Sequence, residues 1–259
     1  MIHLHEKRYE YLEEINEGVV RQIPVQQGAQ RPTVLDVGCG GGALSEAIRQ
    51  RGYEVWGVEE NEEAAGRAAR RLDGVLHLNL HDYAAVRAGL GARKFDYLVF
   101  SDVLEHVYDP YSVLREYLRH VKDGGRVVIS VPNALVWTNR ASFLFGRFEY
   151  ADTGVMDRTH IRWFTFRSAK RLVRAAGCTL ERVDYTPFFV RAALPLIKKM
   201  LRSGPDGNRR QLIDSPAYKT YMRTVYPLEY IAGFLFKSWF GFRIILVGVK
   251  TPAALPTDA

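Results

Sequence analysis

Residues 33–42 read TVLDVGCGGG, and this stretch decides the fold. The run from Val34 to Val37 is largely apolar, as is typical of a strand buried inside a parallel sheet. Four glycines follow within five residues, and glycine accepts both the left-handed backbone of a tight turn and the close approach of a ligand. Residues 43–50 are predicted to form a helix that closes near Gly52. A strand, a glycine turn and a helix N-terminus in this order predict a nucleotide-type ligand at the carboxyl end of the strand.

The acidic residue Asp36 narrows the class of ligand, because it lies two positions before the first glycine. A dinucleotide-binding turn usually reads G-x-G-x-x-G and places a pyrophosphate on the helix N-terminus. A carboxylate would repel that pyrophosphate and attract a ligand carrying a sulfonium or an ammonium group. The turn therefore favours a positively charged adenosyl ligand, and a generic turn of another Rossmann-like enzyme is the alternative.

The composition bounds the class of protein. The chain has 259 residues, 47% hydrophobic and 25% charged, which suits one globular domain. We expect no signal peptide and no membrane span, because no apolar run reaches the roughly 20 residues that a bilayer requires. The two cysteines, Cys39 and Cys178, favour a reducing, cytoplasmic location over a disulfide framework. The seven histidines show no metal-ligand spacing along the chain, so we expect no metal.

The positive charge is concentrated late in the chain. Residues 188–250 hold eleven Lys and Arg against three Asp and Glu, a net charge of +8, whereas the whole chain carries +7. This basic patch indicates an anionic partner, acceptor or surface, and a solvated face is the alternative. Residues 230–240 within it are interpreted as a substrate lid, a dimer contact, a membrane-surface element or packed core cover. The first 32 residues are predicted to form a helix over residues 6–22 and a polar linker.

Between these two regions the sequence alternates strand and helix patterns, which predicts a parallel sheet covered by helices. Strands are expected at residues 33–37, 53–58, 75–78, 95–100 and 126–131, and helices at 43–50, 62–72, 109–120 and 165–176. A turn is expected at residues 122–125, before the fifth strand.

Two polar residues at strand ends are candidate ligand contacts. Glu59 follows Asp36 by 23 positions, where a nucleotide-binding fold places an acid for the ribose hydroxyls. Asn79 ends the third strand, where its amide can pair with an adenine edge, although asparagine is equally common in turns.

The remaining motifs resemble those of the class I S-adenosylmethionine (SAM) methyltransferases, and the resemblance covers roughly residues 9–186. It is closest to the ubiquinone/menaquinone-type, methyltransferase-23-like branch, in a subgroup often encoded with sugar and cell-surface polysaccharide enzymes. The motifs are DVGCGGG at 36–42, GVE at 57–59, FD at 95–96, DVLEH at 102–106, DP at 109–110, GGRVV at 124–128, SVPN at 130–133, GRFEY at 146–150 and GVMDRTHIRWFT at 154–165.

The resemblance implies a Rossmann-like, mostly parallel sheet of seven strands with helices on both faces. Its last strand is antiparallel and inserted beside the fifth, which fits residues 179–186 as the sixth strand and 242–249 as the seventh. A single domain then comprises the N-terminal helix and linker (1–32), a cofactor-binding core (33–187), a helical insertion or lid (188–241) and the final strand (242–250).

The resemblance also assigns cofactor contacts to individual residues. The turn residues Asp36, Gly38, Cys39 and Gly40 would lie beneath the methionine moiety of SAM, and Glu59 would hold the ribose. Asn79 stands where the family usually has aspartate, and it is the candidate for the adenine. Ser101 and Asp102 would lie beside the methyl-donor end.

Methyl transfer from a sulfonium is an in-line displacement, and the protein mainly positions the acceptor and excludes water. An alcohol acceptor must also lose a proton, for which histidine is the usual base. His106 and His160 are the candidates, and Asp157, three residues before His160, is a candidate to fix the tautomer of that ring. Loop-bracing roles for both histidines are the alternative, in which case proximity alone carries the reaction.

The chain has no (N/D/S)-P-P-(Y/F) motif after its fourth strand, of the kind found in amino-methylating enzymes, so oxygen is the favoured acceptor atom. The leading hypothesis is O-methylation of a sugar-containing or other small hydroxylated metabolite. The alternatives are a lipid-linked or membrane-associated acceptor reached through residues 188–241 at the inner membrane face, an RNA substrate, a non-catalytic SAM-binding protein and an oxidoreductase. Nucleic acid is disfavoured because no appended RNA-binding module is visible.

Overall fold

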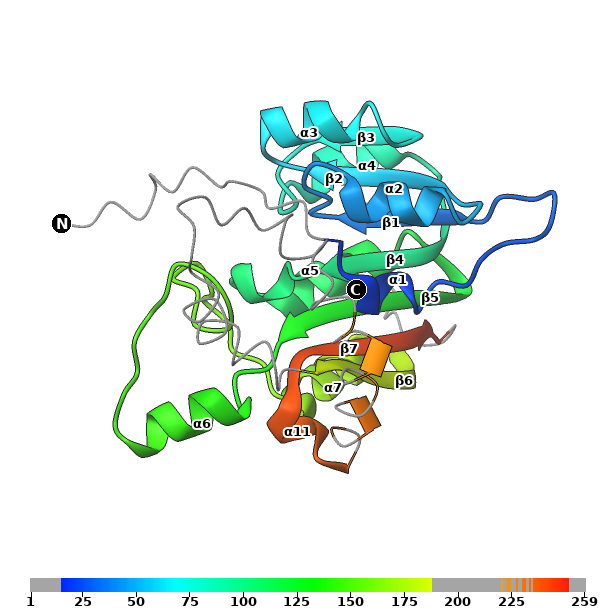
Figure 1. Ribbon diagram of the computed structural model, residues 1–259. Helices are drawn as coiled ribbons and strands as arrows, with labels where there is room; N and C mark the ends of the chain where they lie inside the picture. Colours follow the sequence, from blue (N-terminus) through cyan, green and yellow to red (C-terminus); the bar gives the residue numbers. More distant parts are fainter. Residues whose placement is uncertain are drawn as a thin grey trace, which may run out of the picture.

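The computed structural model describes residues 15–187 and 235–251, together with residues 220, 223–224, 227, 230–231 and 233. One seven-stranded sheet with the order β3-β2-β1-β4-β5-β7-β6 organises this part of the chain (Figure 1). The strands are β1 (Thr33–Val37), β2 (Glu54–Glu59), β3 (Gly74–His77), β4 (Phe95–Ser101), β5 (Val121–Pro132), β6 (Cys178–Pro187) and β7 (Gly241–Lys250). β7 runs antiparallel to both neighbours, β5 and β6, while the pairs formed among β1 to β5 are parallel. The predicted sheet and its inserted antiparallel last strand are confirmed.

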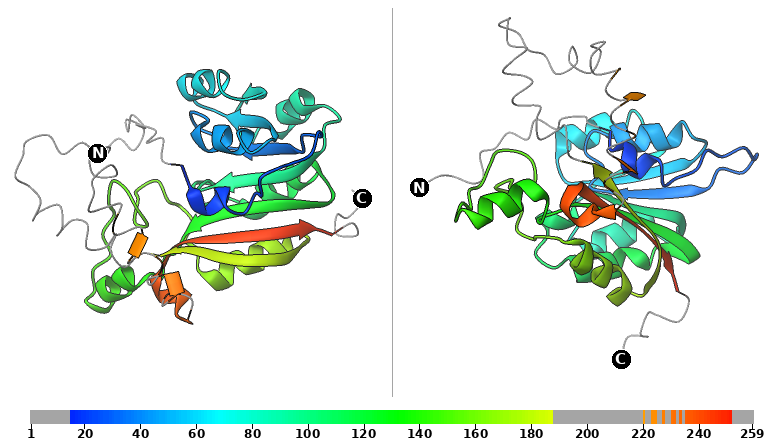
Figure 2. Two further views of the ribbon diagram at one scale, coloured as in Figure 1. Left: turned by 45° about the vertical axis from the view of Figure 1, so that its right-hand side comes forward. Right: turned by 60° about the horizontal axis from the view of Figure 1, so that its bottom comes forward.

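Helices pack on both faces of this sheet, as predicted (Figure 2). One face carries α1 (Glu17–Val20), α2 (Ala43–Arg49) and α3 (Glu62–Ala68). The other face carries α4 (Tyr83–Leu90), α5 (Pro110–Leu118) and α7 (Phe166–Ala175). α6 (Trp137–Leu144) lies away from both helical layers, and the short helices η1 (Leu104–His106) and α11 (Lys237–Phe240) lead out of β4 and into β7.

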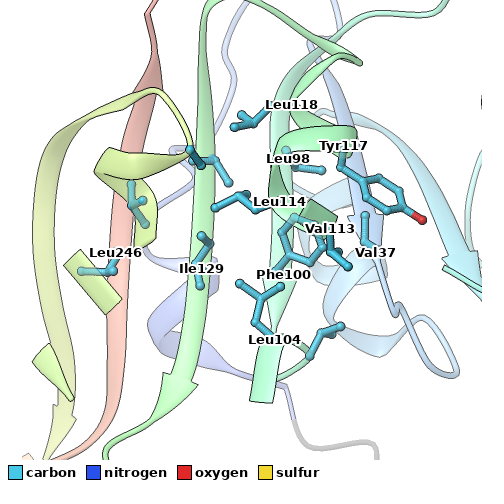
Figure 3. Close-up of a cluster of buried hydrophobic side chains, with 14 of the residues drawn as sticks. Val37, Leu98, Phe100, Leu104, Val113, Leu114, Tyr117, Leu118, Ile129 and Leu246 are labelled. Carbon is cyan, nitrogen blue, oxygen red and sulfur yellow. The ribbon is translucent and has the colours of Figure 1, made fainter. Parts of the chain in front are cut away.

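The larger apolar core lies between the sheet and the α4, α5 and α7 layer. Side chains of β4 and β5 meet those of α5 and of η1 there, and Phe100 contacts Tyr117 edge to face at 5.7 Å between ring centroids. Figure 3 shows this cluster, with Leu98 and Phe100 of β4 facing Leu114 and Tyr117 of α5. Because β4 is buried on both faces, its carboxyl end is held firmly, and the functional segment 101–106 begins there.

The local patterns mispredicted three features. The α4 and α6 helices were not predicted, because α4 buries only Val86 and Leu90, and α6 buries only Asn139, so neither shows a clear apolar stripe. Residues 122–125, predicted as a turn, lie within β5. Val121 pairs with Phe95 and Arg126 with Tyr97, so these four residues bulge out of the strand opposite a single residue of β4.

Several predictions fall on residues outside the described part of the chain. Of the predicted helix at residues 6–22, the described portion is helical at α1 only. Most of the insertion at 188–241 is likewise outside, so its role and the proposed division of the domain stay predictions. Among the described residues, no helix has both the length and the apolar character that crossing a bilayer requires.

Replacing Gly38 with alanine should destabilise the fold. Gly38 has φ +72°, and an added Cβ would lie 2.7 Å from Cγ2 of Val103. The left-handed backbone alone costs a non-glycine residue roughly 1–2 kcal/mol, so we expect a loss of about 1–3 kcal/mol in the free energy of unfolding by urea titration. Gly66 of α3, where an added Cβ would meet nothing within 4 Å, is the control. Gly66→Ala should stabilise by about 0.5–1 kcal/mol, and equal effects of the two changes would contradict the account.

Candidate active site

The glycine turn after β1 is built on left-handed backbone, as its sequence predicts. Gly38, Gly40 and Gly42 have φ of 72°, 54° and 83°. The N–H groups of Gly38 and Cys39 both donate to the carbonyl of Val58 on β2, at 2.8 and 3.2 Å. These bonds fix the turn against the end of the neighbouring strand, so the carboxyl ends of β1 and β2 form one continuous edge.

Glu59 lies at this edge and points its carboxylate at the turn. One oxygen accepts from the Gly40 N–H at 2.8 Å, and the other accepts from the Asn61 N–H at 2.9 Å. The side chain is only 4% exposed. A carboxylate accepts hydrogen bonds on both oxygens, and ribose hydroxyls are donors that match it. The geometry therefore fits the ribose role that the sequence predicts.

Asp36 is buried beneath the turn and is 1% exposed. Its Oδ2 accepts from the hydroxyl of Ser45 on α2, while its Oδ1 has no hydrogen-bond partner among the described residues. Burial, with a smaller contribution from the negative charge of Glu59, raises the pKa of Asp36 to about 7. Asp36 therefore lies beneath the turn, and both its contact with the ligand and its preference for a positively charged ligand stay predictions.

Replacing Asp36 with asparagine should flatten the pH dependence of stability. The folded-state pKa is raised from 3.8 to about 7, so the folded protein holds a proton that the unfolded chain releases. Stability is therefore lost as pH rises from about 4 to about 7, by up to roughly 4 kcal/mol from this group. Urea unfolding between pH 4 and 8 should show that the free energy of unfolding of Asp36→Asn increases relative to that of the parent protein as pH rises.

Asp96 provides a control, because its effect on stability depends on pH in the opposite direction. Hydrogen bonds and charge from Lys122, together with bonds from Thr33, lower the pKa of Asp96, so its stabilising effect is lost as pH falls. Asp96→Asn should therefore lose stability relative to the parent at neutral pH. If the free energy of unfolding of Asp36→Asn had the same pH dependence as that of the parent, the inference that Asp36 holds a proton in the folded protein would be wrong.

Two further predicted cofactor residues make other contacts. The sulfur of Cys39 is buried against Gly57, where an added Cβ would lie 2.5 Å from it, and burial raises the pKa of the Cys39 thiol. Cys39 can therefore contribute to a ligand only through the turn backbone. Asn79 is exposed; its amide donates to Glu60 at 2.7 Å, and its carbonyl oxygen accepts from the His81 N–H. An adenine contact by Asn79 stays a prediction.

A polar network closes the end of β4. Asp102 has φ 56°, a strained value for a non-glycine residue, and its carboxylate pairs with Arg243 of β7 at 2.7 Å. The hydroxyl of Ser130 donates to Asp102 at 2.8 Å. The amide of Asn16 donates to the hydroxyls of Ser101 and Ser130 at 3.3 and 3.0 Å. Ser101 and Asp102, both predicted, are thus held by residues from three other segments.

The two candidate histidines are brought together. The rings of His106 in η1 and His160 in the loop before α7 lie 4.8 Å apart between centroids, edge to face. The N–H groups of Ile161 and Arg162 donate to the carbonyl of Glu105, at 2.9 and 3.0 Å, which ties the two segments to each other. Val103, at the start of the same segment, packs on Gly38. The histidines therefore belong to the same edge of the sheet as the glycine turn.

Hydrogen bonds to the main chain fix the tautomer of both rings. Nδ1 of His106 lies 3.2 Å from the carbonyl of Thr159, and Nδ1 of His160 lies 2.9 Å from the carbonyl of Val155. A carbonyl accepts only, so Nδ1–H donates in each case and Nε2 of the neutral ring keeps its lone pair. Burial, and then the charge of His160, lower the pKa of His106, which keeps that ring neutral near pH 7.

Asp157 forms a local turn with Thr159. Its carboxylate accepts from both the N–H and the hydroxyl of Thr159, at 2.9 and 2.7 Å, as is common for aspartate. Its pairing with His160 stays a prediction. A second acid beside His160 is Glu105, whose Oε1 lies 4.0 Å from Nε2 of that histidine. Burial, and then the charge of Asp102, raise the pKa of Glu105 well above its ordinary value.

Sequence reasoning missed three residues of this site. Glu105 stands inside the quoted DVLEH motif, and its position beside His106 is the one signal that pointed to it. Asn16 and Arg243 gave no signal, because they reach the end of β4 from opposite ends of the chain. The expectation of no metal site rested on spacing along the chain, and the fold nevertheless brings Glu105, His106 and His160 within ligand distance of one another.

Aromatic side chains continue from the histidines toward solvent. Trp163 contacts the His160 ring, with 6.4 Å between centroids, and is followed by Tyr150 and Phe148 at 6.3 and 5.7 Å from Trp163. Tyr150 and Phe148 are about half exposed. This surface offers flat apolar faces for an acceptor next to two imidazoles.

Comparison with known proteins identifies relatives. The model of the methyltransferase domain family matches residues 4–183. The ubiquinone biosynthesis O-methyltransferase of Pseudomonas paraeruginosa is 40% identical over 144 residues, which cover 54% of this chain and 60% of that protein. The enzyme of the same name from Pseudomonas fluorescens Pf-5 is 37% identical over 142 residues, with the same two shares. The chain thus matches 60% of the length of these curated relatives.

Solved structures share the fold at low identity. A SAM-dependent methyltransferase from Archaeoglobus fulgidus superposes with a TM-score of 0.57 at 20% identity, covering 90% of this chain and 92% of that chain. The magnesium protoporphyrin IX methyltransferase of Synechocystis, with bound S-adenosylhomocysteine, gives 0.53 at 15% identity, covering 91% and 81%. The family match confirms the resemblance to the class I SAM methyltransferases, and these structures share their fold; the subgroup associated with sugar enzymes stays a prediction.

Proposed function

Because the chain belongs to the methyltransferase domain family, we propose that it transfers a methyl group from SAM to a hydroxyl of a sugar-containing or other small metabolite. The observation that carries this proposal is a juxtaposition at one edge of the sheet. The Glu59 carboxylate is aimed at the glycine turn at the ends of β1 and β2, and the neutral imidazole of His106 follows the end of β4.

The residues present fit the cofactor. Any side chain at Gly38 would collide with Val103, so this turn leaves its backbone bare. Glu59 would hold the ribose, and Ser101 and Asp102 would adjoin the methyl-donor end. When bound, SAM supplies an already activated methyl group. The neighbouring Synechocystis structure holds S-adenosylhomocysteine, which supports this choice of cofactor.

The chain's own chemical task is then to position a hydroxyl and take its proton. His106 is the better placed of the two histidines, because it is half-buried whereas His160 is 8% exposed. The Thr159 carbonyl holds His106 Nδ1–H, so Nε2 is the atom that accepts the proton. His160, packed edge to face on His106, acts as a positioning residue. The Asp157–Thr159 turn holds the loop that carries His160.

Oxygen as the acceptor atom is supported by the relatives, which are named O-methyltransferases. The aromatic surface of Phe148, Tyr150 and Trp163 supports an acceptor with a ring whose face can stack. Incubation with SAM labelled in its methyl group and a panel of hydroxylated sugars, nucleotide sugars and phenols tests the proposal. Transfer of label to one class supports it; cofactor binding without transfer to any acceptor would favour a non-catalytic SAM-binding protein.

A lipid-linked acceptor is the second candidate. Leu144 and Phe145, at the end of α6, are 81% and 77% exposed, and Tyr108 and Ile161 near the histidines are also exposed. These apolar side chains suit an acceptor carrying a hydrocarbon tail, and the Pseudomonas relatives are named for ubiquinone biosynthesis. A cytoplasmic enzyme that docks at the inner membrane face is part of this candidate. Label transfer to an acceptor presented in liposomes, but not to its water-soluble head group, would select it.

A further inference from the structure

His106 and His160 lie close to the carboxyl group of Glu105, which takes no part in the proposed proton transfer to His106. One ligand atom from each of Glu105, His106 and His160 lies within 4.8 Å of the others. Both carboxylate oxygens of Glu105 lack a hydrogen-bond partner among the described residues, and the residue is 1% exposed. Such a buried carboxyl group must either hold a proton or meet a cation.

We propose that Glu105, His106 and His160 form a binding site for Zn²⁺, and that the bound ion silences the enzyme. The metal-binding part stands on this geometry alone. The silencing part rests on the proposed function, because the ion would take the lone pair of His106 Nε2 that accepts the acceptor's proton.

The main chain already orients the three ligands. Each histidine donates its Nδ1–H to a carbonyl, of Thr159 or of Val155, which leaves Nε2 as the ring nitrogen with a lone pair for a metal. Histidines that bind metals in proteins are nearly always held by such a bond on the other ring nitrogen. The Glu105 carbonyl is bonded to the His160 loop, so the carboxyl group and both rings are carried by one braced unit.

The donor set selects the ion. Two imidazole nitrogens and one carboxylate oxygen are typical ligands of zinc, and three protein ligands leave a fourth position open. Magnesium and calcium prefer oxygen donors and would bind this set poorly. Bonds of about 2.1 Å in a tetrahedron place ligand atoms roughly 3.4 Å apart. The present spread of up to 4.8 Å therefore requires the side chains to close in by a small rotation.

Calorimetric titration of chelator-treated, tag-free protein with ZnCl₂ tests the site. The protein should carry His3→Gln and His5→Gln, which remove two histidines outside the described residues. We expect one Zn²⁺ per chain and no heat of binding with MgCl₂. Glu105→Gln and His160→Gln should each weaken Zn²⁺ binding by roughly ten-fold or more, since loss of even an outer partner costs about 10–100-fold. His81→Gln, at an exposed histidine, should change nothing.

Every variant should also be titrated with S-adenosylhomocysteine, which reports that it is folded. Absence of saturable Zn²⁺ binding, or full affinity in Glu105→Gln, would overturn the proposal and leave Glu105 holding a proton only. Because cofactor binding is read separately, that result would leave the proposed methyltransferase function standing. Once an acceptor is known, Zn²⁺ should inhibit transfer and a chelator should restore it, and inhibition that persists in Glu105→Gln would contradict the silencing role.

Discussion

Replacing His106 with glutamine should lower the rate of methyl transfer by roughly 10²–10⁴-fold, the usual contribution of a general base. Glutamine keeps a polar side chain of similar reach and can still donate to the Thr159 carbonyl, but it cannot accept a proton at the position of Nε2. The protein should bind S-adenosylhomocysteine with unchanged affinity, because the contacts of the glycine turn and Glu59 do not involve this residue. The loss should therefore appear in kcat.

Single-turnover measurements in the presence of a chelator give the decisive comparison. His120 is the control: burial lowers its pKa as it does that of His106, but His120 lies at the far end of α5, before β5. His120→Gln should change stability more than the transfer rate. If His106→Gln turned over at the parental rate, His106 would be a bracing residue and the reaction would depend on proximity alone.

Replacing Glu59 with glutamine should weaken S-adenosylhomocysteine binding by roughly 100-fold or more. Each hydrogen bond from a ribose hydroxyl to a charged carboxylate contributes about 1.5–3 kcal/mol. Glutamine would also present an NH₂ group to one of the two backbone N–H donors, of Gly40 or Asn61, and so disturb the turn itself. Both effects reduce affinity for any ligand that is held by this edge.

Glu60 is the adjacent control, because its exposed carboxylate bonds Asn79 rather than the turn. Glu60→Gln should keep the affinity within a few-fold of the parent. Thermal unfolding of the Glu59 variant without ligand separates a damaged turn from a lost contact. Equal affinities of the Glu59 and Glu60 variants would show that the ligand is held elsewhere.

The sheet could be predicted because its signals are local. Apolar runs, the glycine turn and the predicted helix starts at residues 109 and 165 correspond to the structure, where Asp109 and Thr165 are the N-caps of α5 and α7. The strand order required the family resemblance, since nothing local says that β7 inserts between β5 and β6. The α6 helix was not predicted, because a helix that buries few side chains against the rest of the protein has no apolar stripe.

Candidate site residues could be predicted where they follow a strand end or lie in a family motif. Glu59 ends β2 and Ser101 ends β4, directly before Asp102, and the cofactor roles of all three stay predictions. The proximity of Glu105 to His160 was not predicted, because it depends on the tertiary contact between two segments that are distant in sequence. Arg243 and Asn16 reach the end of β4 from strands and segments distant in sequence. Such long-range polar contacts leave no periodicity to detect.

The most direct test of the central claim is a calorimetric titration of the chain with S-adenosylhomocysteine and, in parallel, with NAD⁺. We predict saturable binding of one S-adenosylhomocysteine per chain and no binding of the dinucleotide, whose pyrophosphate would lie close to the Glu59 carboxylate at the glycine turn. Binding of NAD⁺ without binding of S-adenosylhomocysteine would contradict the account.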